Sequence, residues 1–206
     1  MKNQTTRFVR ISSGSATMDR PYIFGIGAGK TGGHSLAEAL RRLGFATHHV
    51  GNLCYHGDTF IRDTMLQNRA NGDCPTDGIA GIDAIVDWPA HEMFRELDRG
   101  VQEAKFVLTY RPPDDCAISW CRMIARQHRN VGEGWPKGFI EYADLVRQHN
   151  DAVVRHFFGR PDKLLILDAR DDSETKWALL SKFFGMPCPG GEYPHEFDHA
   201  KWEPAK

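Results

Sequence analysis

An apolar run that ends in glycines and a lysine constrains this chain more than any other feature. Residues 21–45 are PYIFGIGAGKTGGHSLAEALRRLGF. Residues 22–28 have the length and polarity of a strand that is buried on both faces. Helical spacing then relates four apolar residues, Leu36, Ala39, Leu40 and Leu43. A buried strand, a tight glycine-rich turn and a helix predict the start of a βαβ unit on a parallel sheet.

The rest of the chain repeats this alternation. Further strands are predicted at residues 45–50, 79–86, 105–110 and 163–169. Helices are predicted at residues 32–44, 56–70, 89–97, 112–127, 139–158 and 173–185. Strands that alternate with helices predict an α/β fold of three layers, in which helices flank a mostly parallel sheet. We expect a flexible polar arm at residues 1–20 and a single domain at 21–206.

Composition excludes several classes of function. The 206 residues have a formal net charge of −1, so no broad basic surface is present for nucleic acid. No apolar run is long enough to cross a bilayer, and the N-terminus lacks the apolar segment of a signal peptide. The five cysteines are odd in number and form no CxxC motif. We therefore predict a cytoplasmic protein with reduced thiols and without nucleic-acid or membrane partners.

The turn after the first strand has the features of an anion site. The N-terminus of a helix presents backbone N–H groups and the positive end of the helix dipole. Glycines here allow the backbone to approach a ligand closely. Lys30 adds a positive charge, and Thr31 and Ser35 add hydroxyl groups. A phosphate-like group is the ligand that this combination favours.

The turn does not match the loop that binds ATP or GTP. That loop has the pattern G-x-x-x-x-G-K-[ST]. Counting back from Gly29 and Lys30, the first glycine belongs at position 24, where the sequence has Phe24. Gly25 stands one position too late. The loop is therefore short by the residue that completes the wrap around a β-phosphate.

A second set of phosphate-binding residues follows the strand at 105–110. Arg111 directly follows this strand, and Ser119 lies eight residues further on, in the next predicted helix. The planar guanidinium of arginine matches the geometry of a phosphate monoester. A serine on the second turn of the helix can reach the same oxygens. A salt bridge from Arg111 to Asp114 or Asp115 is the alternative that the sequence leaves open.

These two stretches together resemble the sulfotransferase family that uses 3′-phosphoadenosine 5′-phosphosulfate (PAPS). The family's 5′-phosphosulfate loop has the pattern K-[TS]-G-[TS]-[TS]-x-L. The matching residues are Lys30, Thr31, Gly32, Ser35 and Leu36. Gly33 and His34 depart from the pattern, since the family usually has hydroxyl residues there. The stretch KFVLTYRPPDDCAISW resembles the family's 3′-phosphate site, and the likeness extends over residues 21–197.

The resemblance implies a fold similar to that of P-loop nucleoside triphosphate hydrolases. It implies PAPS as the sulfate donor, 3′,5′-bisphosphoadenosine (PAP) as the product, and no metal. It also implies that Lys30 neutralises charge near the bridging oxygen of the donor. The residues implied in nucleotide binding are Gly29, Lys30, Thr31, Gly32, Gly33, His34, Ser35, Arg111 and Ser119.

A catalytic base is expected at a neighbouring strand end. The stretch IVDWPAHEMF supplies Asp87, His91 and Glu92, and the resemblance favours Asp87. Desolvation beside Trp88 would raise the pKa of Asp87 toward a useful range. The alternative is that Asp87 caps a helix that Pro89 opens.

Other readings of the sequence stay open. A P-loop kinase or other phosphotransferase would need magnesium, for which Asp168 at the end of a strand is a candidate ligand. A non-catalytic module that binds PAP is the third reading. We expect a small-molecule acceptor with a hydroxyl or an amine, and leave a homodimer open. Trp135 is assigned either to an acceptor pocket or to the core. The residues set aside as surface or strand positions are His48, His49, Cys54 and His56.

Overall fold

The computed structural model describes residues 21–50, 59–127 and 138–195. Strands and helices alternate along these residues. The strands are β1 (Ile23–Gly25), β2 (Thr47–His49), β3 (Ala84–Val86), β4 (Lys105–Tyr110) and β5 (Leu164–Asp168). The helices are α1 (Gly33–Arg42), α2 (Phe60–Asn71), α3 (Phe94–Gly100), α4 (Pro113–Gln127), α5 (Phe139–His156) and α6 (Ser173–Phe184).

The strands form one parallel sheet with the order β2-β3-β1-β4-β5. β1 therefore lies at the centre, between β3 and β4. The chain crosses from one side of β1 to the other in passing from β3 to β4. Ligands of open α/β sheets bind beyond the carboxyl ends of the strands, next to such a change of direction.

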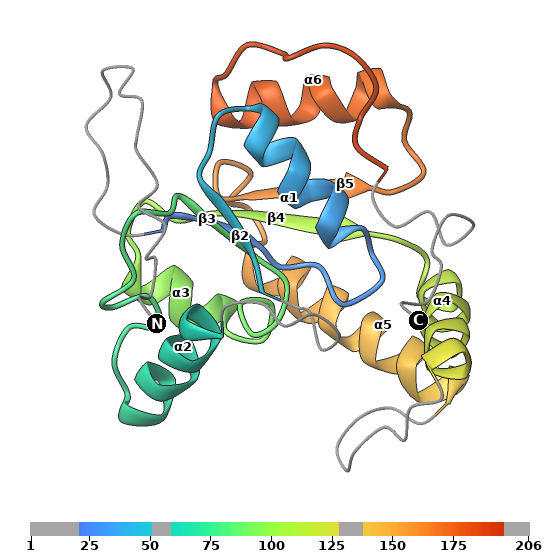
Figure 1. Cartoon of the computed structure of the whole chain (residues 1–206), viewed down its shortest axis with the longest axis horizontal. Helices are drawn as coiled ribbons and strands as arrows, with labels where there is room; N and C mark the ends of the chain where they lie inside the picture. The colour runs from blue at the N-terminus through green and yellow to red at the C-terminus, as the bar shows by residue number, and fades with distance from the viewer. Residues whose placement is uncertain (1–20, 51–58, 128–137, 196–206) are drawn as a thin grey trace, which may run out of the picture.

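Helices cover both faces of the sheet, as Figure 1 shows. α1 and α6 lie on one face, and α3 and α5 lie on the other, with α2 beside α3. α4 packs against α5 next to the carboxyl end of β4. The three-layer α/β fold predicted from the sequence is thus confirmed.

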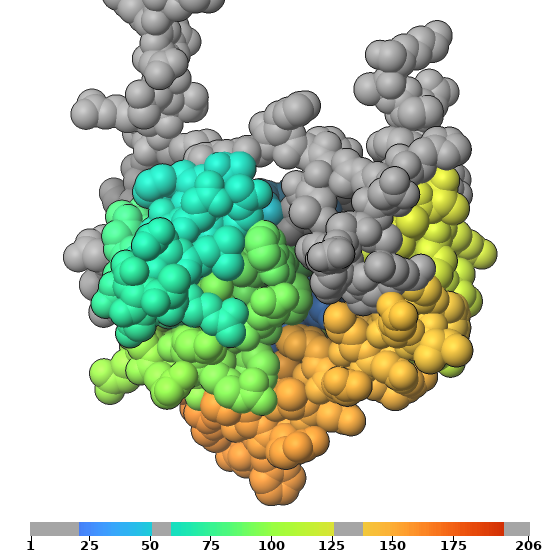
Figure 2. All heavy atoms as spheres, turned by 90° about the horizontal axis from the view of Figure 1, so that it is seen from below, coloured from blue at the N-terminus to red at the C-terminus, as the bar shows by residue number. Residues whose placement is uncertain are grey.

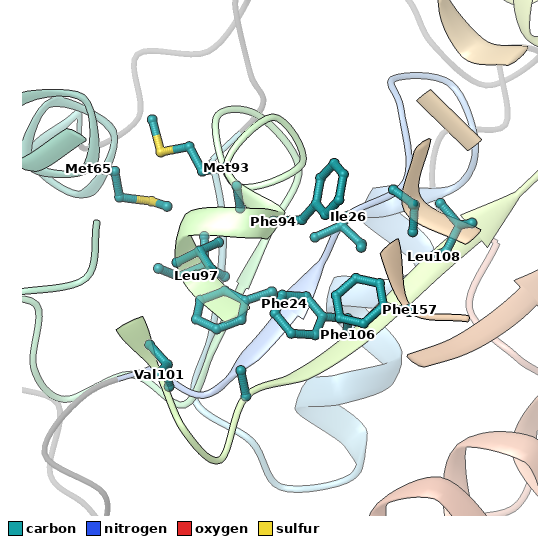
Figure 3. Packing of buried hydrophobic residues seen from close by; sticks show 14 of the residues in the cluster. Phe24, Ile26, Met65, Met93, Phe94, Leu97, Val101, Phe106, Leu108 and Phe157 are labelled. Atoms are coloured by element: carbon teal, nitrogen blue, oxygen red, sulfur yellow. The ribbon is translucent and has the colours of Figure 1, made fainter. Parts of the chain in front are cut away.

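Successive side chains along each strand point to opposite faces of the sheet, so each face has its own part of the hydrophobic core. Ile23 and Val107 are fully buried against the α1 and α6 layer. Phe24 and Phe106 point to the opposite face, where they pack with Phe157 (Figure 3). The ring centroids lie 5.5 Å apart for Phe24 and Phe106, and 4.6 Å apart for Phe106 and Phe157. Burying each such ring contributes about 1.5–3 kcal/mol, so β1 and β4 are held firmly in the middle of the domain.

A third cluster joins the turn after β1 to helices α4 and α5. Ala28 in this turn packs with Trp120 of α4 and Tyr142 of α5. The rings of Trp120 and Tyr142 are stacked, with centroids 4.5 Å apart and planes 4° apart. The two helices therefore form a packed wall beside the turn.

Two predicted elements begin later than the sequence indicates. A strand was predicted from residue 79, but β3 begins at Ala84, because Gly81 adopts a φ of 78° and turns the chain. A helix was predicted from Pro89, but residues 89–93 form turns and α3 begins at Phe94. The predictions for strands at 22–28 and 45–50 are correct in place but too long.

Several predictions concern parts of the chain that the structure does not describe. The arm at residues 1–20 lies outside the described residues, as do Cys54, His56 and Trp135. Within residues 21–50, 59–127 and 138–195, the cysteines are free thiols. No helix in this part of the chain combines the length and the apolar character that crossing a membrane requires.

Replacing Gly27 with alanine tests the close approach of β1 and β4. A Cβ atom at Gly27 would lie 2.0 Å from Thr109 Oγ1, 2.6 Å from Thr31 Oγ1 and 2.7 Å from the carbonyl oxygen of Thr109. Because backbone must move, we expect Gly27→Ala to lower the free energy of unfolding by about 1–3 kcal/mol in urea titrations. Gly138→Ala is the control, since its Cβ would meet nothing within 4 Å. Equal stability of the two variants would contradict the proposed crowding.

Candidate functional site

The polar residues singled out from the sequence follow the strands at one edge of the sheet. Each of the five strands is followed or ended there by a residue with an ionisable side chain. In the spatial order of the strands these residues are His49, Asp87, Lys30, Arg111 and Asp168. Neighbouring strands lie about 5 Å apart, and β1, whose following turn carries Lys30, lies between β3, which Asp87 follows, and β4, which Arg111 follows.

Lys30 has an unusual backbone conformation at the centre of this edge. Its φ is 68°, in the left-handed region that residues other than glycine rarely adopt. The next turn brings Gly32 to a φ of 109° as the N-cap of α1. The ammonium group of Lys30 lies 3.5 Å from the sulfur of Met123 on α4. The lysine side chain therefore reaches across the edge toward the face of α4 that carries Met123.

Buried hydrogen bonds hold the backbone of the turn in place. The hydroxyl of Thr31 donates to the carbonyl of Ala28 (2.5 Å) and lies 2.7 Å from the hydroxyl of Thr109 in β4. Tyr142 of α5 donates from its hydroxyl to the carbonyl of Gly29 at 2.7 Å. Thr31 is only 2% exposed. Its hydroxyl is thus directed into the core, which differs from the ligand-facing hydroxyl predicted from the sequence.

The backbone carbonyls of Arg111 and Lys30 both lie near the side chain of one cysteine. The sulfur of Cys116 on α4 lies 4.0 Å from the carbonyl oxygen of Lys30 and 3.7 Å from that of Arg111. Burial raises the pKa of the Cys116 thiol to about 12, so this contact is made by a neutral group. Ser119 lies one turn further along α4, and Met123 one turn beyond Ser119. Residues three or four apart share a helix face, so Ser119 lies between the cysteine and the group that Lys30 contacts.

The predicted alternative for Arg111 is not realised. Asp114 instead pairs with Arg147 of α5 at 3.0 Å. With respect to the described residues, the guanidinium of Arg111 makes neither an ion pair nor a hydrogen bond, although it is partly buried. Ser119 is 8% exposed, and its hydroxyl likewise has no hydrogen-bond partner in the described part of the chain. A partly buried guanidinium just before α4 and a buried hydroxyl on α4 provide donors for an anion.

Asp87 lies in a tight group of polar side chains on the other side of Lys30. Its φ is 79°, and Lys30 and Asp87 are the two described non-glycine residues with positive φ. One carboxylate oxygen, Oδ2, lies 3.3 Å from Nε2 of His49. The other, Oδ1, accepts a hydrogen bond from the N–H of Trp88 (2.7 Å) and lies 3.8 Å from Nδ1 of His91. The carboxylate therefore has polar contacts on both oxygens.

The environment of Asp87 corrects two expectations. Burial opposes ionisation of the carboxyl, but the contacts from His49, His91 and the N–H of Trp88 outweigh it, and the pKa of Asp87 lies below its ordinary value. We predicted a raised pKa from desolvation beside Trp88, and that prediction is wrong. The alternative that Asp87 caps a helix is also excluded, because α3 begins only at Phe94. Strained backbone at two neighbouring strand ends is typical of functional sites.

Two histidines near Asp87, His34 and His91, are neutral at pH 7. Burial, together with the neighbouring ring of His49, lowers the pKa of His34 to about 4, and burial also lowers the pKa of His91 to about 4. Burial lowers the pKa of His149 as well. Nε2 of His149 lies 2.7 Å from the carbonyl oxygen of Ile26, so this nitrogen carries the proton and donates it. The carboxylate of Asp87 therefore has the neutral rings of His34 and His91 in its surroundings.

Sequence reasoning missed His49, which we set aside as a surface or strand residue. Its side chain is 7% exposed, and its ring stacks on His34 of α1 with centroids 3.7 Å apart. The signal in the sequence was its place at the end of the strand at 45–50, next to Val50. Without the strand order, nothing indicated that β2 lies beside β3 and brings His49 to Asp87. Glu92, a further base candidate, is exposed and accepts a hydrogen bond from the indole of Trp88 at 3.1 Å.

Asp168 has a local partner. Arg170 contacts both of its carboxylate oxygens, at 3.0 Å from Nε to Oδ1 and 2.6 Å from Nη2 to Oδ2. β5 is the outer strand, and β4 separates it from β1. Among the described residues, no group of three or more histidine, cysteine or acidic side chains is arranged to hold a metal ion. The geometry thus gives no support to Asp168 as a magnesium ligand beside Lys30.

Comparison with known proteins agrees with this geometry. A family profile described as "Sulfotransferase domain" matches residues 22–144. Among solved structures, the crystal structure of a sulfotransferase from Alicyclobacillus acidocaldarius is similar, with a TM-score of 0.55 and 17% sequence identity. The similarity covers 91% of this chain and 88% of the other chain, and it shows a shared fold. Among curated protein sequences, none matches the chain significantly.

Lowering the pH should destabilise the folded protein, because the buried His91 ring binds a proton less readily than it does in the unfolded chain. Its pKa is about 4 in the folded chain and about 6.5 in an unfolded one, so the unfolded chain binds the extra proton between these values. We expect the free energy of unfolding to fall by about 2–3 kcal/mol as the pH decreases from 6.5 to 4. His91→Gln should lose less stability over this range, as measured by urea titration at several pH values. His195→Gln, at an exposed position, is the control; a pH dependence that is identical in both variants would contradict the prediction.

Proposed function

The chain belongs to the family of sulfotransferase domains, whose profile matches more than half of it, and from this premise we propose that it transfers a sulfuryl group from PAPS to a small acceptor. The acceptor atom is the oxygen of a hydroxyl or the nitrogen of an amine. PAP is the second product. Lys30 and the N-terminus of α1 bind the 5′-phosphosulfate, and Arg111 with Ser119 binds the 3′-phosphate.

The observation that carries this proposal is the pairing of Lys30 with Arg111 beside one sulfur atom. Both backbone carbonyls lie within 4.0 Å of Cys116 Sγ, so the two residues lie near each other at the edge of the sheet. A nucleotide that carries anions at both the 5′ and the 3′ position needs two such sites. The guanidinium of Arg111 has no acidic partner among the described residues, which supports an anionic ligand there.

Sulfuryl transfer does not require a covalent bond between the substrate and the protein. The acceptor oxygen or nitrogen forms a bond to sulfur as the bond from sulfur to the bridging oxygen of PAPS breaks. The electron pair of the broken bond stays with the 5′-phosphate of PAP. Lys30 stabilises this developing charge, an interaction that is stronger in the transition state than in the ground state. We place the group that removes the acceptor's proton on the same side of Lys30 as Asp87.

The kinase reading has weaker support. It requires magnesium near the phosphates. The candidate ligand Asp168 ends the outer strand β5, and its carboxylate is already bound by the guanidinium of Arg170. It also requires the first glycine of the P-loop pattern, which is Phe24 here. Phe24 is fully buried in the core, so this position cannot contribute to a phosphate wrap.

Thermal stability with three nucleotides tests the assignment of the site. We expect PAP to raise the melting temperature more than adenosine 5′-phosphate does, and more than ADP with magnesium does. Arg111→Gln should weaken PAP binding about 10- to 100-fold and abolish the preference over adenosine 5′-phosphate, because charge-assisted hydrogen bonds are worth about 1.5–3 kcal/mol. Arg170→Gln is the matched control, since its guanidinium at the next strand end is already bound by Asp168.

Turnover then separates an enzyme from a module that only binds PAP. PAP release from PAPS is followed with a panel of phenol, alcohol and amine acceptors. In an enzyme, Lys30→Met abolishes release while PAP still binds. A parent protein that binds PAP but releases none from PAPS supports the binding module instead. Preferential stabilisation by ADP with magnesium would contradict both and favour the kinase.

A further inference from the structure

We propose that His49 is a catalytic residue and that Asp87 acts through it. In this arrangement Nδ1 of His49 accepts the proton of the acceptor, while Asp87 binds the proton on Nε2 and positions the ring. The inference rests on the proposed sulfuryl transfer and defines how the acceptor is activated. His49 comes from β2 and Asp87 from the end of β3, so the pair exists only because these strands are neighbours.

Geometry and burial support the pair. Nε2 of His49 lies 3.3 Å from Oδ2 of Asp87 in a nearly closed environment, with 7% of the histidine side chain and 16% of the aspartate side chain exposed. The positive φ of Asp87 is a strained conformation, and such strain persists where the surroundings require it. Nε2 is shielded from solvent and makes no hydrogen bond of standard geometry among the described residues, so the carboxylate oxygen at 3.3 Å is the polar atom that it faces.

Charge fixes the tautomer of His49. The pKa of Asp87 lies below its ordinary value despite burial, so the carboxyl is ionised at pH 7 and can only accept hydrogen bonds. A nitrogen that faces an ionised carboxylate at 3.3 Å is favourable only if it carries a proton. When Nε2 carries the only ring proton, the lone pair of the ring is on Nδ1, which is then the nitrogen left for an acceptor.

The two loop positions that depart from the family pattern both contact His49. A Cβ atom at Gly33 would lie 3.3 Å from His49 Nε2 and 3.6 Å from Asp87 Oδ2, so a serine or threonine there would crowd the pair. His34 stacks its ring on that of His49 at 3.7 Å. The departures at Gly33 and His34 thus make room for the imidazole and cover one of its faces.

The surroundings also stabilise the charge that the reaction creates. When the acceptor loses its proton to Nδ1, His49 becomes an imidazolium beside the carboxylate of Asp87. The ionisable groups near the pair include His34 and His91, and the pKa of each is about 4, so both stay neutral. They also include Tyr142, whose pKa is raised by burial, so its hydroxyl stays neutral as well. The charges of Lys30 and Arg41 help to lower the pKa of His34. The proton ends on His49 and the electron pair on PAP, so the step is balanced.

Nitrogen NMR tests the pair without any acceptor. In protein labelled with ¹⁵N-histidine, the His49 signals are identified by their loss in His49→Gln. We expect the Nε2–H tautomer in the parent protein, and a mixture of tautomers in Asp87→Asn. Asp98→Asn is the matched control, because Asp98 pairs with His156 at 2.8 Å near the opposite edge of the sheet. A parent protein with the proton on Nδ1 of His49 would overturn the proposal.

Turnover completes the test. With PAPS and the acceptors of the panel, or water where no acceptor reacts, His49→Gln and Asp87→Asn should lower PAP release about 100-fold or more. PAP affinity should change less than twofold, and Asp98→Asn should match the parent. The acidic limb of the pH–rate profile should disappear in His49→Gln. Full activity of His49→Gln overturns this inference alone, whereas failure of the parent to bind PAP overturns the proposed function and leaves the NMR test valid.

A separate surface supports a second inference. α5, the residues after it, and β5 border a hollow of about 520 Å³. Figure 2 shows α5 on the same face of the molecule as α2 and α3. Three apolar side chains there are unusually exposed: Val154 by 43%, Ile166 by 46% and Phe158 by 86%. Leu108 of β4 forms part of the lining. Apolar side chains that gather around a hollow are typical of an interface.

We infer that a second copy of this chain covers this surface. Asp151 and Arg155 border the hollow one helical turn apart, on either side of Val154. Neither forms an ion pair with any residue in the described part of the chain. When two copies of α5 pack antiparallel about a two-fold axis, Arg155 of each meets Asp151 of the other, with the apolar side chains between them. This charge pattern is complementary to itself, which favours a second copy over an unrelated partner.

Sedimentation equilibrium of variants in which the charges at positions 151 and 155 are reversed tests the dimer. We expect a dimer for the parent chain, and at least a tenfold weaker association for Arg155→Asp and for Asp151→Arg. The double variant, with the charges exchanged, should associate again, because the pairs are restored across the axis. Glu103→Lys at an exposed position is the control. A monomeric parent chain, or a double variant that stays monomeric, would overturn the inference.

Discussion

The close approach of β1 and β4 at Gly27 is the contact on which the rest of the site depends. Backbone and hydroxyl groups of Thr109 occupy the space that any side chain at Gly27 would need. Thr31 bonds to Thr109 and to Ala28, and so closes the turn from within. The turn is thereby tied to β4, the strand that carries Arg111. Packing of the backbone thus holds Lys30 and Arg111 near each other, with both of their carbonyl groups within 4.0 Å of Cys116 Sγ.

Strained backbone conformations and polar side chains occur together at the edge of the sheet where the strands have their carboxyl ends. Lys30 and Asp87 adopt positive φ at the ends of adjacent strands, where the sheet has satisfied its own hydrogen bonds and the chain must turn. The hydrophobic layers on both faces of the sheet supply the stability that supports these conformations. The helical wall of Trp120 and Tyr142 adds a fixed support, since Tyr142 bonds directly to the carbonyl of Gly29. A rigid scaffold of this kind favours an enzyme that works by positioning its substrates.

Most of the fold could be predicted from the sequence, because it depends on patterns within single segments. The buried strand at 105–110 and the long helix from 139 have periodicities that later contacts do not alter. Boundaries were less certain where a turn interrupts an apolar run, as Gly81 does before β3. The glycine-rich turn with Lys30 and the position of Arg111 could be identified because each comes after a predicted strand. The contact of His49 with Asp87 and the direction of the Thr31 hydroxyl could not, since both depend on neighbouring strands.

By itself, the sequence determined the alternation of strands and helices, the glycine-rich turn with its lysine, and the arginine after β4. These features are local, so the order of residues along the chain is sufficient to establish them. Only the tertiary structure decided that β3 and β4 flank β1 and that His49 lies against Asp87. It also decided the sign of the pKa change at Asp87, because burial and nearby polar groups act in opposite directions there. Such a balance depends on distances between segments far apart in the chain, and no local pattern encodes them.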